Sequence, residues 1–261
     1  MKFAALTMVY RDYPALRRWV DHFGGLFGRQ NLYVVSHGGD PEHDKIAHGC
    51  NIIFMPRDDL KRFDLKRGIK MADIRRGIEA DYDAVFQTDA DELLFFRPDF
   101  QFNPDGRAIF AIGMQAFPDG FFFSSRFCKA VAAWGGNRLH LHGVRLQSEP
   151  LYTPNLTPGL FLVHTKYYDV DALAASNEVR SEVANGAPGQ VDTASWRKPL
   201  KISLEHIKVY EKRAWGDWDV ALAEFCNAMP AKWRVMPCGK TIAAKTHRSP
   251  CRVRLPEWTG L

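Results

Sequence analysis

The stretch "AVFQTDADELLFF", residues 84–96, decides how this sequence folds and what it could bind. Asp89, Asp91 and Glu92 place three carboxylates within four positions, between the apolar runs "AVF" and "LLFF". Like charges repel one another, and buried charge is costly in free energy. A chain that holds three carboxylates at the end of a buried segment therefore needs a compensating partner for them.

Three explanations are open for this acidic run. The carboxylates could be solvated surface charge, which is the commonest fate of Asp and Glu. They could close a turn or cap a helix through hydrogen bonds. They could also bind a divalent cation, which removes the repulsion and prefers oxygen ligands. The apolar residues on both sides favour the cation, because they predict buried backbone before and after the run.

The segments around the acidic run alternate between strand and helix patterns. Apolar runs predict strands at 3–9, 31–40, 50–56 and 83–87, and helical spacing predicts helices at 13–27 and 63–80. This alternation predicts an α/β fold with a mostly parallel central sheet and helices on both faces. In such sheets ligands bind beyond the carboxyl ends of the strands. The acidic run begins just past one of those ends.

The second half of the sequence is less regular. Strands are expected at 108–117, 129–134 and 159–164, and helices at 171–183 and 215–229. The length of 261 residues suggests one large domain, or one domain with a lobe added at an end.

Composition and charge narrow the functional classes. Hydrophobic residues make up 46% of the chain and charged residues 25%, which is ordinary for a globular protein with a full core. The net charge of +5 is too small to indicate nucleic-acid binding, but it suits an anionic small substrate or a phosphate-rich surface. No apolar run reaches the roughly 20 residues that span a bilayer, and "MKFAALTMVYRD" lacks the long apolar core of a secretory signal. We therefore expect a cytoplasmic protein, with peripheral membrane contact left open.

Several segments together resemble glycosyltransferases of the GT-A fold, in particular a bacterial family-2-like group with a "DxDE" motif. "FQTDADELLFF" is similar to that group's metal motif, and "LTMVYRDYPALRRWVDHF" to its first strand and aromatic-rich helix. "SHGGD" is similar to the turn after the second strand, and "CKAVAAW" to a Lys-bearing strand on the acceptor side. "LHLHG" and "FLVHTKYYD" resemble two His-containing segments downstream. The resemblance covers residues 2–171 and implies a Rossmann-like nucleotide-diphospho-sugar transferase fold.

The resemblance also implies a division of the chain and an activity. The GT-A core would cover 1–184, with a nucleotide and metal half over 1–100 and an acceptor half over 101–184, and residues 185–261 would form a C-terminal extension packed on it. The implied reaction moves a sugar from a UDP- or GDP-sugar to a hydroxyl of a glycan or lipid-linked acceptor, in bacterial surface glycan or polysaccharide synthesis. The Gln-x-x-Arg-Trp signature of processive polysaccharide synthases is absent from the sequence, so transfer of a single sugar is expected.

The chemistry explains why such an enzyme needs the acidic run. Negative charge builds up on the nucleoside diphosphate as it leaves, and a bound Mn²⁺ or Mg²⁺ neutralises that charge. The resemblance implies that Asp91 is the main metal ligand and a catalytic residue, and that Asp89 contacts the metal or the ribose. His164 would be a further metal ligand, with a core or turn histidine as the alternative. Glu92 is expected to shape the turn.

Five further residues are candidates for binding the nucleotide. Thr7 and Arg11 would line the base pocket at the end of the first strand. Asp40, at the end of the second strand, would bind the base or the ribose, with a plain turn aspartate after Gly-Gly as an equal alternative. Arg67 and Lys70 precede the metal strand on a predicted helix and could reach the diphosphate. A solvated helix face is the alternative for both.

The acceptor side carries fewer signals. An inverting enzyme needs a base near the acceptor hydroxyl, and Glu149 and Asp119 are candidates without a motif behind them. Two other classes of protein stay open. The first is a metal-dependent hydrolase or nucleotidyltransferase of an α/β fold, although "TMVYRDYP" lacks the glycines of a nucleotidyltransferase loop. The second is a non-catalytic module that binds a sugar or a nucleotide.

Overall fold

The computed structural model describes residues 1–58, 60–102, 108–134, 138–139, 146–147, 156–186, 199–235 and 241–259. The chain forms two compact units. The first contains Met1–Leu93 and Asp169–His206, and the second contains Leu94–Tyr168 and Ile207–Leu261. The predicted division into a core over 1–184 and an extension over 185–261 stays a prediction. No helix in the described part of the chain has the length and apolar character needed to cross a membrane.

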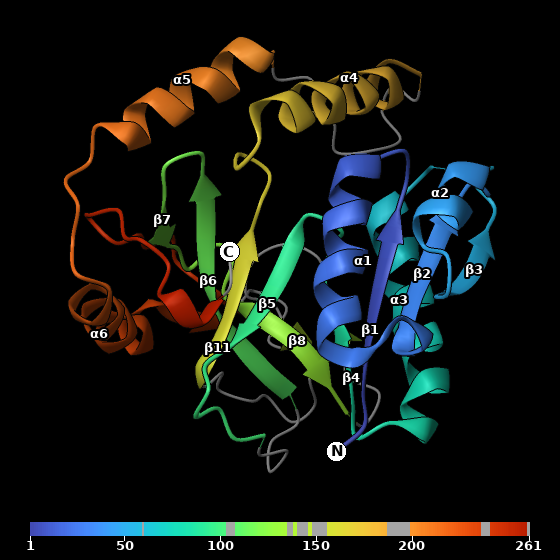
Figure 1. The fold of residues 1–261 in the computed structure, drawn as a ribbon, viewed down its shortest axis with the longest axis horizontal. Coiled ribbons are helices and arrows are strands. Elements are labelled where there is room, and N and C mark those ends of the chain that lie inside the picture. Colours follow the sequence, from blue (N-terminus) through green and yellow to red (C-terminus); the bar gives the residue numbers. More distant parts are fainter. Residues whose placement is uncertain are drawn as a thin grey trace. The chain divides into compact units, whose positions relative to one another are not determined.

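A four-stranded parallel sheet forms the centre of the first unit (Figure 1). Its strands are β1 (Phe3–Val9), β2 (Leu32–His37), β3 (Asn51–Met55) and β4 (Ala84–Gln87), in the order β3-β2-β1-β4. β1 pairs in parallel with β2 and with β4, and β2 pairs in parallel with β3. The carboxyl ends of all four strands therefore lie at one edge of the sheet.

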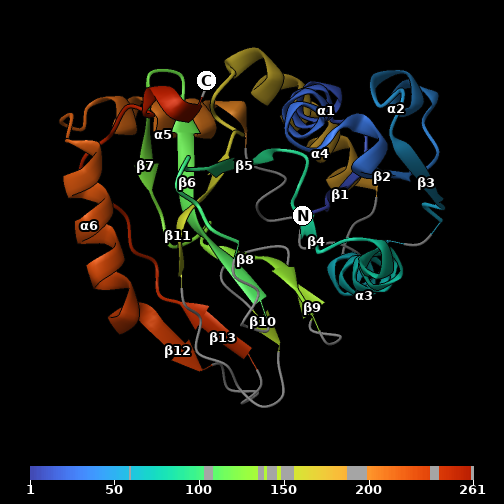
Figure 2. The ribbon, with the colours of Figure 1, turned by 60° about the horizontal axis from the view of Figure 1, so that its bottom comes forward.

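Helices cover both faces of this sheet, which confirms the predicted α/β fold. α1 (Tyr13–Phe27) and α3 (Phe63–Ile78) lie on opposite faces, as Figures 1 and 2 show. α2 (Pro41–Ile46) follows β2, and α4 (Val170–Gly186) runs past the carboxyl ends of the strands. Two short 3-10 helices, η1 (Arg29–Asn31) and η2 (Glu79–Asp81), lead into β2 and β4.

The burial pattern of β1 explains why the sheet carries helices on both faces. Residues 4–9 of this strand are all buried, as expected for a parallel strand that is covered on both sides. Leu6 and Met8 point to one face, where they join a core cluster with Met71 and Ile78 of α3. Thr7, between them in the strand, points to the opposite face.

A tryptophan fixes α1 to the beginning of the acidic run. Trp19 is fully buried, and its indole N–H donates a hydrogen bond to Thr88 Oγ1 at 2.8 Å. Thr88 is itself buried and directly follows β4. The bond therefore sets the position at which the chain leaves the sheet toward Asp89.

The second unit contains two sheets. The strands of the first sheet are β5 (Glu92–Phe96), β6 (Ala108–Phe117), β7 (Gly120–Phe123), β8 (Lys129–Ala133) and β11 (Leu156–His164). Their order is β5-β11-β6-β7, and β8 also pairs with β6. β6 is parallel to β11 and antiparallel to β7 and β8. The second sheet is antiparallel, in the order β12-β13-β10-β9, with strands β9 (Arg138–Leu139), β10 (Leu146–Gln147), β12 (Trp233–Val235) and β13 (Thr241–Ala244).

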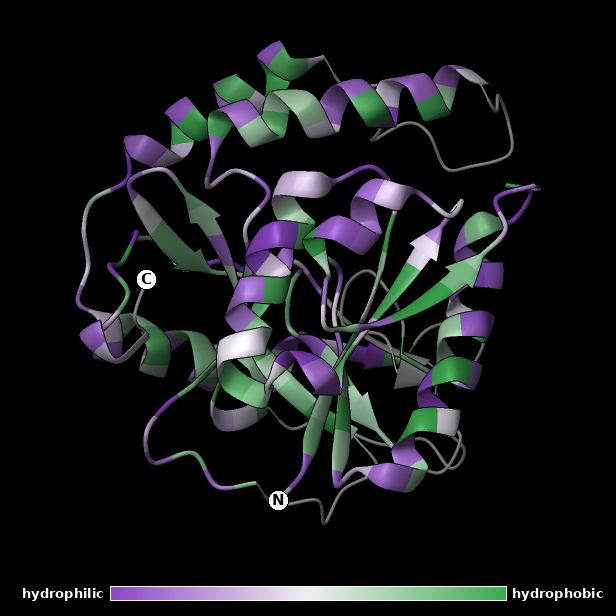
Figure 3. Cartoon of the chain, turned by 45° about the vertical axis from the view of Figure 1, so that its right-hand side comes forward, coloured by the Kyte–Doolittle hydropathy of each residue, from purple (hydrophilic) through white to green (hydrophobic). Residues whose placement is uncertain are grey.

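The remaining helices are α5 (Leu200–Glu211), α6 (Trp218–Ala228), η3 (Met229–Lys232) and η4 (Glu257–Thr259). The strands expected at 108–117, 129–134 and 159–164 are confirmed as β6, β8 and β11, and the expected helices as α4 and α6. In Figure 3 the strands of the parallel sheet are mostly green, whereas purple and green bands alternate along the helices. This difference follows from burial of the strands on both faces.

Substitution of Thr88 tests the link between α1 and the acidic run. Thr88→Val removes the hydroxyl acceptor and leaves the buried indole N–H of Trp19 without a partner. We expect the free energy of unfolding, measured by urea denaturation, to fall by about 1–3 kcal/mol. Thr88→Ser keeps a hydroxyl and should lose much less. In a Trp19→Phe background the donor is already absent, so an equally large effect of Thr88→Val there would contradict the assignment.

Candidate functional site

The parallel sheet reverses its strand order between β1 and β4. The chain passes from β1 to β2 and β3 on one side, and then crosses to β4 on the other side of β1. In open α/β sheets, ligands bind outside the carboxyl ends of the strands at such a switch point. Residues 10–12 follow β1 and residues 88–91 follow β4, so these two segments flank the expected ligand position.

The acidic run starts with a turn that its own glutamate closes. The backbone N–H of Asp89 donates to Glu92 Oε2 at 2.8 Å, and the backbone N–H of Glu92 donates to the carbonyl of Asp89 at 3.0 Å. Glu92 is 3% exposed. The expectation that Glu92 shapes the turn is confirmed, and the two reciprocal bonds fix the backbone that carries Asp89 and Asp91.

Each aspartate of the motif has an arginine partner. Arg67 Nη2, from α3, lies 2.5 Å from Asp89 Oδ1, and Arg180 Nη2, from α4, lies 3.3 Å from Asp91 Oδ2. All four side chains are between 12% and 22% exposed. Ion pairs that are sheltered from solvent are screened by salt less than pairs on the surface. Two guanidinium groups therefore offset the repulsion among the carboxylates of the acidic run.

A third carboxyl group, that of Asp12, is close enough to Asp91 for the two charges to interact. Asp12, which follows β1, accepts a hydrogen bond from Ser176 Oγ of α4 at 3.1 Å. Burial raises the pKa of Asp12 above its usual value, and the negative charge of Asp91 raises it further. Sequence reasoning missed Asp12, because only the pairing of β1 with β4 brings it to the acidic run.

Arg11, predicted to line the base pocket, has an unusual backbone conformation. Its φ of 51° lies in the left-handed region, which non-glycine residues rarely adopt and which is concentrated at functional sites. Its guanidinium donates to Glu182 of α4 at 2.8 Å, and its backbone N–H donates to His43 Nε2 at 3.3 Å. The segment after β1 is thus held from both sides, by α2 and by α4.

A basic-aromatic cluster, formed by Tyr10, His37, Arg57 and Phe63, lies at the same edge of the sheet. The guanidinium of Arg57 lies over the Tyr10 ring at 3.6 Å from its centroid and donates to His37 Nδ1 at 2.9 Å. The rings of Phe63 and His37 stack at 5.1 Å between centroids. Arg57 has no acidic partner within the described residues.

The charge balance of the basic-aromatic cluster favours an anionic ligand. Burial and, to a smaller extent, the positive charges of three nearby side chains together lower the pKa of His37 to about 4. These side chains are Arg57, Arg67 and Lys70. His37 is therefore neutral near pH 7 and accepts the hydrogen bond from Arg57. Cations that crowd a neutral histidine attract negative charge to this side of the switch point.

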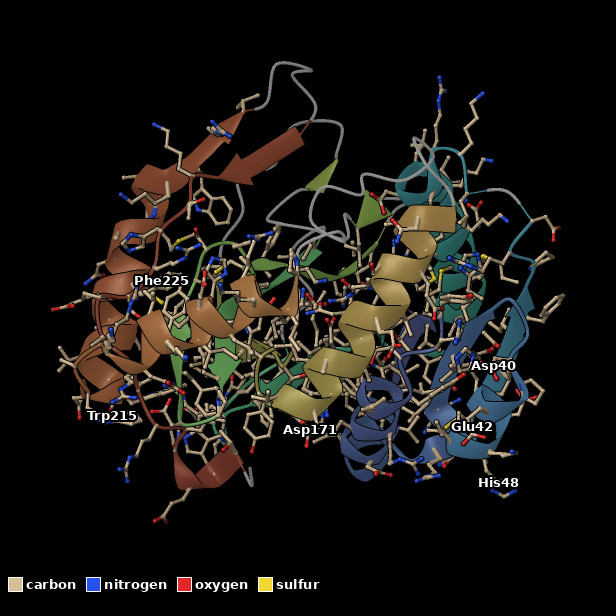
Figure 4. The ribbon with its side chains drawn as sticks, turned by 90° about the horizontal axis from the view of Figure 1, so that it is seen from above. Asp40, Glu42, His48, Asp171, Trp215 and Phe225 are labelled. Atoms are coloured by element: carbon tan, nitrogen blue, oxygen red, sulfur yellow. The ribbon has the colours of Figure 1, made fainter. Side chains whose placement is uncertain are left out.

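Asp40 has a structural role. Its Oδ1 accepts from the backbone N–H of Glu42 at 2.9 Å and caps α2, where Figure 4 shows both residues. Its Oδ2 accepts from the hydroxyl of Tyr13 at 2.6 Å, and this bond lowers the pKa of Asp40. These contacts are those of a turn aspartate, which is the alternative interpretation of the sequence. Contact of Asp40 with a base or ribose stays a prediction.

The structure places the other nucleotide candidates on two elements of the first unit. Thr7 lies inside β1, is fully buried, and has no hydrogen-bond partner for Oγ1 among the described residues. Arg67 and Lys70 lie one helical turn apart on α3; Arg67 is paired with Asp89, and Lys70 is exposed. Contact of these three residues with a nucleotide stays a prediction.

The acceptor-side candidates belong to the second unit. His164 ends β11, where its Nδ1 lies 2.9 Å from Gln115 Oε1 and its ring stacks on Phe127 at 4.3 Å between centroids. Its role as a metal ligand stays a prediction. Asp119 forms an ion pair with Arg252. Glu149 lies outside the described residues.

The chemistry of the acidic run fits a hard divalent cation. Asp89 and Asp91 supply the carboxylate oxygens that Mg²⁺ and Mn²⁺ prefer. Among the described residues no three His, Cys, Asp or Glu side chains converge as a metal-binding group. Many Mg²⁺ sites use only one or two carboxylates and take their other ligands from substrate phosphates and water. Two aspartates at the carboxyl edge of a parallel sheet match that arrangement.

The second unit encloses a cavity of about 560 Å³. Its lining is mostly apolar and includes Ile112, Leu156, Leu222, Met229 and Trp233, with Arg97 as the charged side chain among the lining residues. Among the predicted site residues that the structure describes, none lines this cavity.

Comparisons with known proteins give distant similarities only. No family model and no curated protein matches the sequence. The chain is similar to the mannose-1-phosphate geranyltransferase from Thermus thermophilus, with a TM-score of 0.27 and 10% identity over 73% of this chain and 69% of that chain. It is also similar to the inositol-1-phosphate CTP transferase from T. maritima, with a TM-score of 0.30 and 16% identity over 64% of this chain and 72% of that chain. TM-scores of this size do not establish a shared fold.

Acidification should destabilise the protein through His37. The pKa of this side chain is about 4 in the folded chain and 6.5 as the ordinary value, so between these values the unfolded chain binds a proton that the folded chain does not. The contribution of His37 to the free energy of unfolding is complete above about pH 6.5. It decreases by at most about 3 kcal/mol as the pH falls toward 4. Urea denaturation across this range measures it. His37→Gln stays neutral and should remove this part of the pH dependence; an unchanged pH dependence in that variant would contradict the assignment.

Proposed function

We propose that this chain is a glycosyltransferase that moves a sugar from a nucleotide-diphosphate sugar to an acceptor hydroxyl, with Mn²⁺ or Mg²⁺ held by Asp89 and Asp91. One observation carries the proposal: carboxylates and cations face each other at the switch point of a parallel sheet, where an α/β fold binds its ligands. A metal–diphosphate group needs both kinds of charge side by side. The two similar solved structures are transferases by name, and their low TM-scores add no weight.

The cations on α3 and after β3 suit the diphosphate of the donor. Arg57 and Lys70 have no acidic partner in the described part of the chain, so an anion can bind them without breaking an ion pair. A guanidinium presents a planar fork of N–H donors that matches phosphate oxygens. The rings of Tyr10 and His37 add flat surfaces against which a nucleobase can stack.

Each residue of the acidic run then has a distinct role. Asp91 and Asp89 hold the cation, which supplies Lewis-acid neutralisation of the leaving diphosphate. Arg67 orients the Asp89 carboxylate from α3. Glu92 fixes the turn from which both aspartates extend. Thr7 and Arg11 would line the pocket of the base at the end of β1.

The acceptor side of the proposal rests on the sequence resemblance. It assigns His164 as a further metal ligand, Glu149 as the base of an inverting reaction, and a glycan or lipid-linked hydroxyl as the acceptor. The proposed setting is a cytoplasmic step of bacterial surface glycan synthesis. The donor would be a UDP- or GDP-sugar, and Asp40 would contact its base or ribose.

A metal-dependent nucleotidyltransferase or hydrolase is the main alternative, since it uses the same kind of carboxylates. Nucleotidyltransferases hold the triphosphate with a glycine-rich loop after the first strand, because glycine lets backbone N–H groups approach phosphates closely. The loop after β1 consists of Tyr10, Arg11 and Asp12 and has no glycine. This favours a donor that is bound through its diphosphate and a metal.

A donor screen tests the proposed activity. The melting temperature is measured with UDP-, GDP-, CMP- and dTDP-sugars, with and without Mn²⁺. We expect one uridine or guanosine sugar to raise it only when Mn²⁺ is present, because a ligand that binds the folded state alone stabilises it by mass action. Asp91→Asn should abolish the metal-dependent shift. Asp73→Asn, in an exposed ion pair on α3, is the matched control and should keep it.

The product distinguishes the reaction classes. Release of a nucleoside diphosphate in the presence of an acceptor supports glycosyl transfer. Release of pyrophosphate from a nucleoside triphosphate and a sugar phosphate would instead make the chain a nucleotidyltransferase. No stabilisation by any nucleotide sugar with Mn²⁺ would overturn the proposal.

A further inference from the structure

α4 lies at the carboxyl edge of the parallel sheet (Figure 1), and polar side chains tie it to the segments that follow β1 and β4. The contacts of α4 and the residue before it are Asp169 with Arg18 at 3.6 Å, Ser176 with Asp12 at 3.1 Å, Arg180 with Asp91 at 3.3 Å, and Glu182 with Arg11 at 2.8 Å. Three of the four partners directly follow β1 or β4. The helix is therefore tied to the proposed donor site rather than to the middle of the sheet.

The buried face of α4 offers little apolar area. Its buried residues are Leu173, Ser176 and Ala184, of which only Leu173 has a large apolar side chain. Figure 3 shows hydrophilic and hydrophobic segments alternating along the helix. A helix with few buried apolar contacts lies at the low end of local stability. The polar contacts therefore decide where α4 lies, and a change in the charges of the site can move it.

Arg180 holds its aspartate more loosely than Arg67 does. The Arg180–Asp91 contact is a single pair at 3.3 Å, whereas Arg67 lies 2.5 Å from Asp89. The positive charge of Arg180 also acts on Asp12, where it lowers the pKa of the carboxyl group. One cation is thus shared between two carboxylates of the site, which makes it the easier of the two arginines to displace.

We propose that Arg180, together with the metal, stabilises the negative charge of the leaving diphosphate. It neutralises Asp91 while the site is empty, and it transfers to the diphosphate when metal and nucleotide occupy the aspartates. This inference rests on the proposed function. A divalent cation at Asp91 repels the guanidinium, and the diphosphate oxygens beside it attract the guanidinium. α4 can follow Arg180, because Leu173 is the one large apolar side chain among the buried residues described for this helix.

This assignment gives Arg180 a role in the transfer step. The bond between the sugar carbon and the diphosphate oxygen breaks, and its electron pair stays on the diphosphate. The acceptor oxygen forms the new bond to the sugar carbon, and its proton passes to a base. The negative charge that appears on the leaving oxygen is the charge that the Arg180 guanidinium stabilises through N–H donors.

Substitution of Arg180 should have opposite effects on two ligands. Arg180→Gln removes the competitor for Asp91, so the affinity for Mn²⁺ alone should rise, by about 3- to 10-fold for an ion pair of this exposure. The same variant loses a charge-assisted contact to phosphate, so with Mn²⁺ present the affinity for UDP or GDP should fall by about 10-fold. Titration calorimetry measures both affinities, and uridine or guanosine without phosphates should bind the variant and the wild type equally.

Two matched variants separate this role from a structural one. Glu182→Gln breaks the Arg11 contact on the same helix but keeps Arg180, and it should leave the affinity for Mn²⁺ alone unchanged. Arg180→Lys keeps the positive charge but lacks the planar fork of guanidinium N–H donors, so it should retain part of the affinity for the diphosphate. Urea denaturation of each variant verifies that the fold is intact.

The outcomes distinguish this inference from the proposed function. If Arg180→Gln weakens Mn²⁺ and nucleoside diphosphate alike, Arg180 only holds α4 in position and the inference is overturned. The same holds if wild type and variant bind the diphosphate equally well. If the wild-type chain binds Mn²⁺ but neither UDP nor GDP, the proposed function fails, and the role at the diphosphate fails with it.

Discussion

Repulsion among carboxylates at the end of a parallel strand is the constraint on which the site depends. Asp89 and Asp91 leave β4 beside Asp12, in a place that is largely closed to water. Charges in that position need counter-charges nearby. Arg67 supplies one from α3 and Arg180 supplies another from α4. The positions of two helices are thus tied to the charges of one turn.

The parallel sheet explains why these groups meet. Parallel strands bring their carboxyl ends to a single edge, so the segments after β1, β2, β3 and β4 lie together although they are far apart in the chain. The reversal of strand order at β1 places the segments that follow β1 and β4 where open α/β sheets bind their ligands. The carboxylates gather there, and Arg57 and Lys70, which have no acidic partner among the described residues, lie near His37 at the end of β2. This separation of charge within one edge is what a metal–diphosphate group requires.

The sequence predicted the first unit well, because its elements have strong local patterns. β1 and β4 are continuous apolar runs, and α1 repeats Leu16, Trp19, Val20 and Phe23 at helical spacing. Short elements were missed, among them α2, β5 and the strands of the antiparallel sheet of the second unit. A six-residue helix that depends on its Asp40 cap and strands of two to five residues carry too little periodicity to be recognised.

The sequence by itself determined the α/β class, the position of the acidic run at a strand end, and the turn that Glu92 closes, because all of these depend on residues close together in the chain. Only the tertiary structure decided which charges face one another. Asp12 meets the acidic run through the pairing of β1 with β4, Arg180 reaches Asp91 from a helix far along the chain, and Arg57 meets His37 across neighbouring strands. Each of these contacts depends on strand order and helix placement, which a local pattern of residues does not specify.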